Sequence, residues 1–296
     1  MSYNGFIFLH KPSGITSFQS LGSLKRIFNT KKIGHTGTLD KFASGAMIVC
    51  VGSFTRLASY ITQQDKEYKA LIRFGIQTDT LDPEGDVVAT GPIPSYEEIL
   101  SVIDNFKGVQ FQVPPKYSAV HIDGKRAYKK VRSGEEFDMP ARKIEIYDIE
   151  PLTYKDGIFE ARIACSKGTY IRSLARDIAQ AVGTVGSLAA LQRTRVGGIT
   201  DDMCSSTEQI MNSPNYCLKT GVESVNSLLN LPSLVIDGKN IDEFSNGQKI
   251  SEEWFKNCQV LHAYGAFIVL SESGEIEGII VREEKGYRYQ CVIHNR

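Results

Sequence analysis

The chain has 296 residues, of which 42% are hydrophobic and 23% charged, and it carries 34 basic and 34 acidic side chains. Length and composition together predict a soluble protein with one large and one small domain. No apolar run approaches the roughly 20 residues that span a bilayer, and no basic segment followed by an apolar one opens the chain, so the sequence predicts a cytoplasmic protein without a membrane segment.

The charges are unevenly distributed along the chain. Residues 1–200 contain 26 basic and 20 acidic side chains, which gives this part +6, and the remainder therefore carries −6. A basic bias is compatible with a polyanionic substrate, although solvated lysines alone would also produce it. The six cysteines are scattered, with no C-x-x-C pair and no histidine at metal-binding spacing, which predicts reduced thiols and no metal site.

The first predicted elements lead to a glycine-rich loop. Residues 5–10 form an apolar run typical of a buried strand, and Thr16 and Ser17 are good N-cap residues for a helix. The loop at 34–40 ends in an aspartate, and an apolar strand at 46–51 supports it. The helix is expected to turn its apolar residues inward, namely Phe18, Leu21, Leu24 and Phe28.

The middle of the chain alternates between strands and helices. Residues 67–74 alternate apolar and polar side chains, as in a strand with one solvent-exposed face, and 82–86 are predicted to form a turn. Ser95 and Glu98 predict a capping box for a helix that ends near Phe106. The remaining predictions are a hairpin at 117–124, strands at 143–152 and 157–165, and a helix that Thr169 caps and Gly183 ends, with Arg172 and Arg176 on its polar side.

The last part of the chain predicts a connector and a small appendage. Residues 200–232 have the pattern of a connector that bears helices. A short helix at 239–246 and strands at 260–261, 266–270, 279–281 and 289–293 then favour a small β-barrel or sandwich. The predicted domains are therefore 1–231 and 232–296.

Asp40, at the end of the glycine-rich loop, is the candidate reactive group. An aspartate in this setting is most often a helix cap or a solvated turn residue. No second carboxylate lies near it in a paired arrangement, so the sequence does not support two-carboxylate glycoside hydrolysis, although folding could bring a distant partner close. An arginine from elsewhere in the chain would keep a single aspartate ionised by lowering its pKa.

Six runs of residues share their order with the motifs of one enzyme family. The runs are 11–17, 34–40 with 43–45, 66–68, 118–128, 168–175 and 191–197. Together they resemble the successive motifs of the TruB family of tRNA pseudouridine synthases. The resemblance extends over about two thirds of the chain.

The resemblance implies an enzyme that converts uridine 55 in the T-loop of tRNA to pseudouridine without a cofactor or a metal. It implies the pseudouridine synthase fold, an α+β architecture in which helices flank a mixed, largely antiparallel central sheet. The C-terminal segment is weakly similar to a PUA RNA-binding barrel, and its charge of −6 fits poorly with heavy phosphate contact. A compact chain without basic tails favours a stand-alone monomer that needs no protein partner.

The resemblance also implies a role for each residue that matches a family motif. Asp40 matches the catalytic aspartate, Arg172 the arginine that pairs with it, and Tyr68 the tyrosine that stacks on the target base. The other matches are to substrate-binding residues, namely His35 beside the flipped-out nucleotide, Lys11 bracing the loop, and Tyr170 and Leu191 in the pocket. Lys41 departs from the family pattern because a proline usually follows the aspartate, and loop stiffness is the property this affects.

The implied chemistry fits these residue types. A carboxylate can attack C1′ of the ribose or C6 of the base, or take a proton from C2′, and an aromatic face supports a detached base. The target base must first be flipped out at a cost of about a few kcal/mol. Eight basic residues within 116–143 are expected to bind RNA phosphates. Two alternatives remain open: a guide-RNA-dependent enzyme of the same family, and a tRNA-folding chaperone that binds the elbow without requiring catalysis.

Overall fold

A mixed sheet of 10 strands forms the centre of the protein in the computed structural model, which describes residues 3–122, 124–256 and 264–293. The strand order is β14-β1-β3-β12-β4-β11-β10-β7, with β2 paired to β3 and β13 paired to β12. The bounds are β1 (Gly5–Lys11), β2 (Ile33–His35), β3 (Ser44–Val51), β4 (Lys66–Phe74), β7 (Gly108–Gln112), β10 (Arg142–Lys155), β11 (Ile158–Cys165), β12 (Gly186–Val196), β13 (Ile199–Thr200) and β14 (Leu218–Lys219). The mixed sheet and its flanking helices agree with the expected pseudouridine synthase fold.

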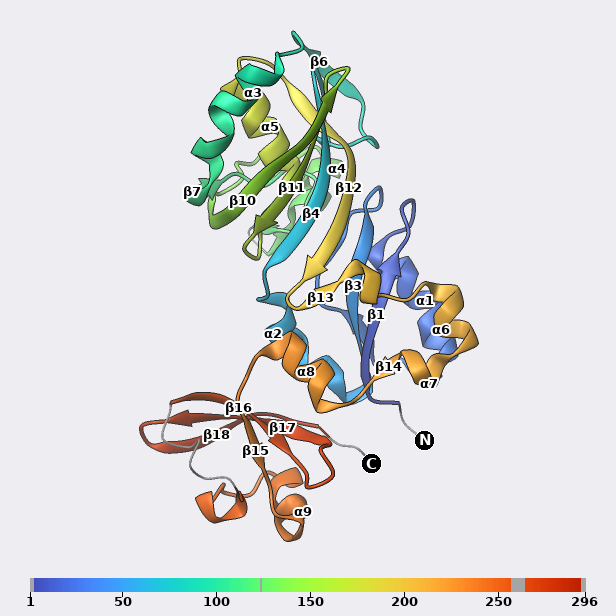
Figure 1. Cartoon of the computed structure of the whole chain (residues 1–296), viewed down its shortest axis with the longest axis vertical. Helices are drawn as coiled ribbons and strands as arrows, with labels where there is room; N and C mark the ends of the chain where they lie inside the picture. Colours follow the sequence, from blue (N-terminus) through green and yellow to red (C-terminus); the bar gives the residue numbers. More distant parts are fainter. Residues whose placement is uncertain (1–2, 123, 257–263, 294–296) are drawn as a thin grey trace.

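Nine α-helices are described in the same residue ranges, besides short 3-10 segments. Figure 1 shows α3 and α5 beside β4, β10, β11 and β12, whereas α1, α6 and α7 lie beside β1 and β3. The bounds are α1 (Ser17–Ile27), α2 (Ala58–Thr62), α3 (Tyr96–Ile103), α4 (Ala127–Arg132), α5 (Ile171–Ala181), α6 (Thr207–Asn212), α7 (Pro214–Cys217), α8 (Val222–Leu229) and α9 (Ile241–Ser245).

The alternation of side chains in β1 and β3 divides the core between two faces. Ile7 and Met47 pack with Leu24 of α1 in one buried cluster, while Phe6 and Ile48, one residue away in each strand, belong to another. Successive residues of a strand point to opposite faces of a sheet, so uninterrupted apolar runs in β1 and β3 bury both faces.

The two halves of the sheet meet where β3 and β12 pair in parallel, with Gln192 beside Ser44 and Arg193 beside Gly45. Gly45 has a φ of +110°, and a Cβ at this position would lie 2.3 Å from the carbonyl oxygen of Arg193. A side chain there would therefore force the strands apart. The loop that ends in Asp40 enters β3 directly beside this junction.

Several predicted elements are confirmed, and others are corrected. The capping box at Ser95 is present, and the face of β4 that carries Tyr68 is buried. Phe18 is 70% exposed, so it is not inward-facing. Tyr170 is the N-cap of α5, because the Thr169 hydroxyl donates to the Ser166 carbonyl oxygen instead of capping the helix.

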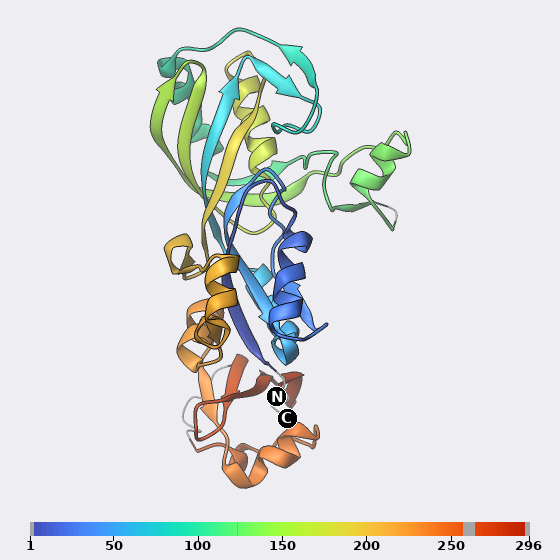
Figure 2. The same cartoon turned by 90° about the vertical axis from the view of Figure 1, so that its right-hand side faces the viewer.

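The predicted hairpin at 117–124 is much shorter than expected. Only β8 (His121–Ile122) and β9 (Lys125–Arg126) are strands, and α4 follows them at once. Figure 2 shows the segment of β8, β9 and α4 projecting from the side of the central sheet, and this segment is called the arm below. Another short hairpin, β5 (Ile76–Thr78) with β6 (Val87–Thr90), holds the turn at 79–86 between its strands.

The C-terminal segment contains a separate four-stranded sheet, in the order β15 (Ser233–Val235), β16 (Gly265–Leu270), β17 (Ile276–Glu283) and β18 (Gly286–Val292). Within the described ranges β15 and β18 do not pair, so the sheet is open and the expected closed barrel is not confirmed. The strand predicted at 260–261 lies outside the described residues. Side chains of β16 and β17 share a buried cluster with β1, β3 and α8, which joins this sheet to the central one. None of the helices that the structure describes has the length and apolar character needed to cross a membrane.

Candidate active site

Buried polar contacts fix the backbone of the loop that carries Asp40. The ammonium group of Lys11, whose side chain is fully buried, donates to the carbonyl oxygens of Pro12 (2.9 Å), Ile15 (2.7 Å) and Lys41 (3.4 Å). The amide of Gly14 also donates to the Lys41 carbonyl oxygen, at 2.8 Å. Burial lowers the pKa of Lys11 to about 8, and the charge of Asp40 opposes this shift. Lys11 therefore braces the residue directly after Asp40.

Arg172, in the first turn of α5, joins the loop to two other segments. Its Nε lies 2.9 Å from Asp40 Oδ2, too poorly aligned for a hydrogen bond, and its Nη2 donates to Asp40 Oδ1 at 3.1 Å. Nη1 donates to the carbonyl oxygen of Thr80 and to Asp82 Oδ2, and Nη2 also donates to the carbonyl oxygen of Tyr117. Arg172 is only 5% exposed, so these contacts are strong and orient its planar guanidinium group.

Asp82 is a site residue that the sequence analysis missed. It is 6% exposed, and its Oδ1 accepts hydrogen bonds from the Thr80 hydroxyl (2.6 Å) and the Glu84 amide (3.0 Å). The sequence identifies 82–86 as a turn, but an aspartate in a turn is usually solvated. No local signal distinguishes a buried partner of a distant arginine from an ordinary turn residue.

Two opposing effects set the pKa of Asp40. The Asp40 side chain keeps 35% of its surface, yet protein atoms surround it closely enough that desolvation raises its pKa above the usual value. The charge of Arg172 lowers the pKa, whereas the nearby carboxylate of Asp82 raises it. The net direction is upward because desolvation is the largest effect, so Arg172 only partly offsets burial.

The charge of Asp40 reaches Tyr68 and Tyr170, and Leu191 packs in the same buried cluster as Tyr68. Burial raises the pKa of Tyr68 to about 12 and also raises that of Tyr170, and the charge of Asp40 adds to both shifts, which places both hydroxyls in its electrostatic field. Leu191, on β12, belongs to the same buried cluster as Tyr68 and Leu39. The structure therefore brings together the aromatic, apolar and charged residues that the motifs indicated.

His35 lies at the other end of the glycine-rich loop, on β2. It is half-buried, and both burial and the charge of Arg193 lower its pKa, which favours the neutral imidazole. Arg193 was not singled out by the sequence analysis, although it lies in the last motif. Its guanidinium group donates to the carbonyl oxygens of Ala46 (2.7 Å) and Gly37 (3.2 Å), and its charge lowers the pKa of Tyr68 against the larger effect of burial. Arg193 thus holds the loop at its middle, as Lys11 does at its end.

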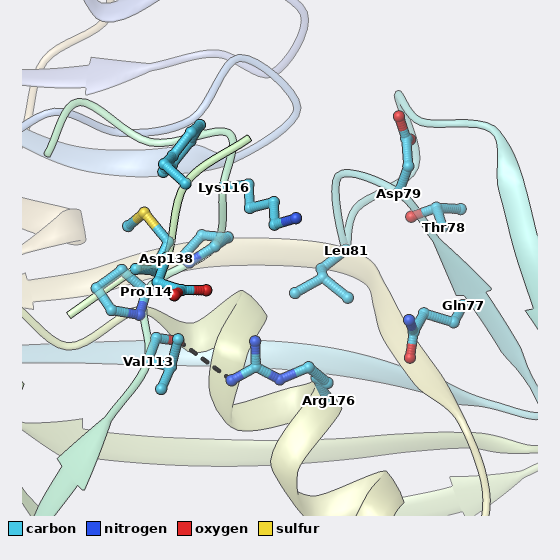
Figure 3. Close-up of a pocket in the computed structure, with 12 residues that line it drawn as sticks. Gln77, Thr78, Asp79, Leu81, Val113, Pro114, Lys116, Asp138 and Arg176 are labelled. Atoms are coloured by element: carbon cyan, nitrogen blue, oxygen red, sulfur yellow. Dashed lines mark hydrogen bonds between the residues drawn. The ribbon is translucent and has the colours of Figure 1, made fainter. Parts of the chain in front are cut away.

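A pocket of about 510 Å³ is lined by residues from 77–81, 113–116 and 137–139 and by Arg176 of α5 (Figure 3). Leu81 and Lys116 in its wall are next in sequence to Thr80 and Tyr117, two partners of Arg172. Arg176 lies one helical turn beyond Arg172, but neither Arg172 nor Asp40 lines the pocket. Arg176 donates to the Val113 carbonyl oxygen at 3.1 Å, along the edge of the pocket. Its lining contains both polar and apolar side chains, and no sequence pattern predicted this pocket.

In the residues that the structure describes, no group of three or more His, Cys, Asp and Glu side chains is arranged to hold a metal ion. The chemistry available at the site is that of one carboxylate beside a guanidinium group, with an aromatic ring nearby. Such an arrangement can supply a nucleophile or a base to a flat, uncharged substrate.

Comparisons with known proteins agree with this geometry. Residues 25–171 match the model of the TruB family pseudouridylate synthase N-terminal domain. The chain is 42% identical to tRNA pseudouridine synthase B of Borreliella burgdorferi (strain ZS7), over 82% of this chain and 85% of that protein. It is 38% identical to the protein of the same name from Borrelia garinii subsp. bavariensis, over 98% of this chain and 99% of that protein.

The fold has solved counterparts as well. A chain in the structure of an H/ACA RNP bound to a substrate RNA containing 2′-deoxyuridine superposes with a TM-score of 0.71 and 20% identity, over 99% of this chain and 86% of that one. Identity this low establishes the shared fold alone. The matches in sequence go further, and they show that this chain belongs to the TruB family of pseudouridylate synthases.

Proposed function

We propose that this enzyme isomerises uridine 55 in the T-loop of tRNA to pseudouridine, with Asp40 as the catalytic carboxylate. The observation that carries the proposal is the two-point contact between Arg172 and Asp40, in a chain whose relatives are named tRNA pseudouridine synthase B. Tyr68 and Leu191 lie in the same buried cluster as Leu39, the residue before Asp40, as a site for a flat base requires.

The reaction balances without a redox partner or a leaving group. The bond from C1′ of the ribose to N1 of uracil breaks, a bond from C1′ to C5 forms, the C5 proton leaves and N1 gains a proton. Asp40 acts by attacking C1′, by attacking C6 of the base or by taking the C2′ proton. The ionised carboxylate is the active form in each route, and Arg172 increases the fraction of that form.

The other residues hold the base and the loop. Tyr68 offers its ring to the detached uracil, and Tyr170 and Leu191 also contact the base. His35 lies beside the flipped-out nucleotide as a neutral imidazole, and Lys11 keeps the carbonyl oxygen that follows Asp40 in place. The free energy of binding the base in this site offsets the cost of flipping it, which is about a few kcal/mol.

The arm and the C-terminal sheet are the proposed RNA contacts. The basic residues of 116–143, among them Lys116 in the wall of the pocket, would bind phosphates of the T-stem–loop. Residues 232–296 are proposed as a PUA-like RNA-binding unit, distinct from the catalytic unit at 1–231. The enzyme is proposed to act in the cytoplasm as a stand-alone monomer. Relatives at 38–42% identity are named tRNA pseudouridine synthase B, whereas the chain from the H/ACA RNP shares only its fold with this protein.

The decisive experiment separates catalysis from RNA binding. Asp40→Asn keeps the size of the side chain but removes the charge, so pseudouridine formation in a free tRNA T-stem–loop should fall by at least about 10²-fold while RNA binding changes little. Asp177→Asn, a partly buried carboxylate on α5 that pairs with Arg176, is the control and should keep its activity. Mass spectrometry of the RNA and a binding titration measure the two effects. Full isomerase activity in the Asp40 variant would exclude the proposed role and leave the chaperone alternative.

A further inference from the structure

Lys41, which follows Asp40, forms an ion pair with a turn on the opposite side of the site. Its Nζ lies 2.6 Å from Glu84 Oε1, and the two side chains are 50% and 39% exposed. A proline at position 41 would fix its own φ and restrict Asp40, whereas a lysine leaves both backbone positions free. Lys11 and Gly14 hold the carbonyl oxygen of Lys41, and the Lys41 side chain adds a contact between the loop and the 79–86 turn.

The turn at 79–86 connects Lys41 back to Asp40 through a closed ring of contacts. The amide of Glu84 donates to Asp82 Oδ1 at 3.0 Å, and Asp82 Oδ2 accepts from Arg172 at 3.1 Å. Arg172 in turn contacts Asp40, whose neighbour Lys41 reaches Glu84. Every link of the ring except the Lys41–Glu84 pair is at least partly buried, so this pair is the one link open to solvent.

We infer that the Lys41–Glu84 ion pair is a positioning contact, which holds the Asp40 loop against the 79–86 turn. It thereby fixes the position of the Asp40 carboxylate relative to Arg172 and the bound base. The inference rests on the proposed function. Small displacements of a reacting group lower the rate of the chemical step, so a restraint on the residue next to Asp40 should affect that step and not RNA affinity.

The size of the effect follows from the exposure of the pair. Exposed ion pairs contribute about 0.2–1 kcal/mol, which corresponds to a change of up to about 5-fold in a rate constant. The alternative is that Lys41 binds an RNA phosphate, in which case Glu84 would be irrelevant and the loss of Lys41 would weaken RNA binding.

The test measures single-turnover rate constants at saturating tRNA T-stem–loop, together with dissociation constants. Lys41→Met and Glu84→Gln should each lower the rate constant about 2- to 5-fold with an unchanged dissociation constant, and the double variant should be no slower than either single one. Lys41→Pro should make the rate insensitive to Glu84→Gln, because proline supplies the restraint from the backbone. Raising the salt concentration from about 0.05 to 0.5 M should slow the wild type toward the variants at saturating RNA.

A second exposed pair serves as the matched control. Arg162 and Glu150 lie 2.7 Å apart on β11 and β10, with side chains that are 50% and 48% exposed, and Arg162→Gln should not change the rate. Additive losses in the double variant, unchanged rates in both single variants, or a weaker dissociation constant for Lys41→Met alone would each overturn the inference. A wild-type protein that forms no pseudouridine would instead overturn the proposed function, so the two failures are distinguishable.

Discussion

Replacing Arg172 tests whether this arginine keeps Asp40 ionised. Attraction between unit charges 2.9 Å apart is about 6 kcal/mol at an effective dielectric constant of about 20, and solvent around the 35% exposed carboxylate leaves only part of that value. An opposite charge at this range shifts a carboxyl pKa by about 1–3 units. Arg172→Ala should therefore raise the pKa of Asp40 further, because the charge that lowers it is gone while desolvation and the carboxylate of Asp82 still raise it.

The assay is the pH dependence of the single-turnover rate constant at saturating RNA. Asp40 is active when ionised, so its acid limb should move to higher pH in Arg172→Ala, and the loss of rate should be greatest at low pH. Arg176→Ala is the control, because Arg176 lies one turn later on α5 and pairs with Asp177 instead of Asp40. An equal loss of rate at every pH, with an unmoved acid limb, would refute the proposed electrostatic role.

The folding of this variant needs its own measurement. Removing Arg172 leaves Asp82 buried without its cation, which typically costs about 3–5 kcal/mol of stability. Combining Arg172→Ala with Asp82→Asn removes that buried charge, so the double variant should melt at a higher temperature than Arg172→Ala alone. The acid limb of the double variant should stay above that of the wild type but lie below that of Arg172→Ala, because the charge of Asp82 no longer raises the pKa of Asp40. This separates the effect on Asp40 from loss of folding.

Three other predictions concern the loop, the arm and the C-terminal sheet. Lys11→Met should lower the free energy of unfolding by about 1–3 kcal/mol in urea titrations, because buried carbonyl oxygens lose their donor; an unchanged midpoint would contradict this. Lys129→Gln in the arm should reduce the slope of log RNA affinity against log salt concentration by about 0.7–0.9, whereas the control Lys155→Gln should leave it unchanged. Equal slopes for the wild type and Lys129→Gln would argue against a phosphate contact at Lys129. Ending the chain at Leu231 should lower the melting temperature, since the shared buried cluster loses β16 and β17. The truncated protein should bind RNA more weakly but keep its rate at saturating RNA. Loss of that rate would place the segment in the catalytic unit.

The sequence by itself determined many of the regular elements. The apolar runs of β1 and β3 and the alternation in β4 are confirmed, because hydrophobic periodicity is a property of the local chain. The capping box at Ser95 is likewise confirmed, since its two partners are three residues apart. Ordered motifs also indicated Asp40 and Arg172, which are 132 residues apart and which no local pattern could have paired.

Tertiary structure alone decided the surroundings of Asp40. Asp82 and Arg193 meet the site only because the sheet brings β4, β12 and the 79–86 turn together, and nothing in their local sequence marks them as partners. Arg172 lowers the pKa of Asp40, as an arginine was expected to do. Desolvation has the larger, opposite effect, and it depends on every segment that packs around Asp40. The partner of Lys41 was equally hidden, because an ion pair between residues 43 positions apart exists only once both loops have been placed.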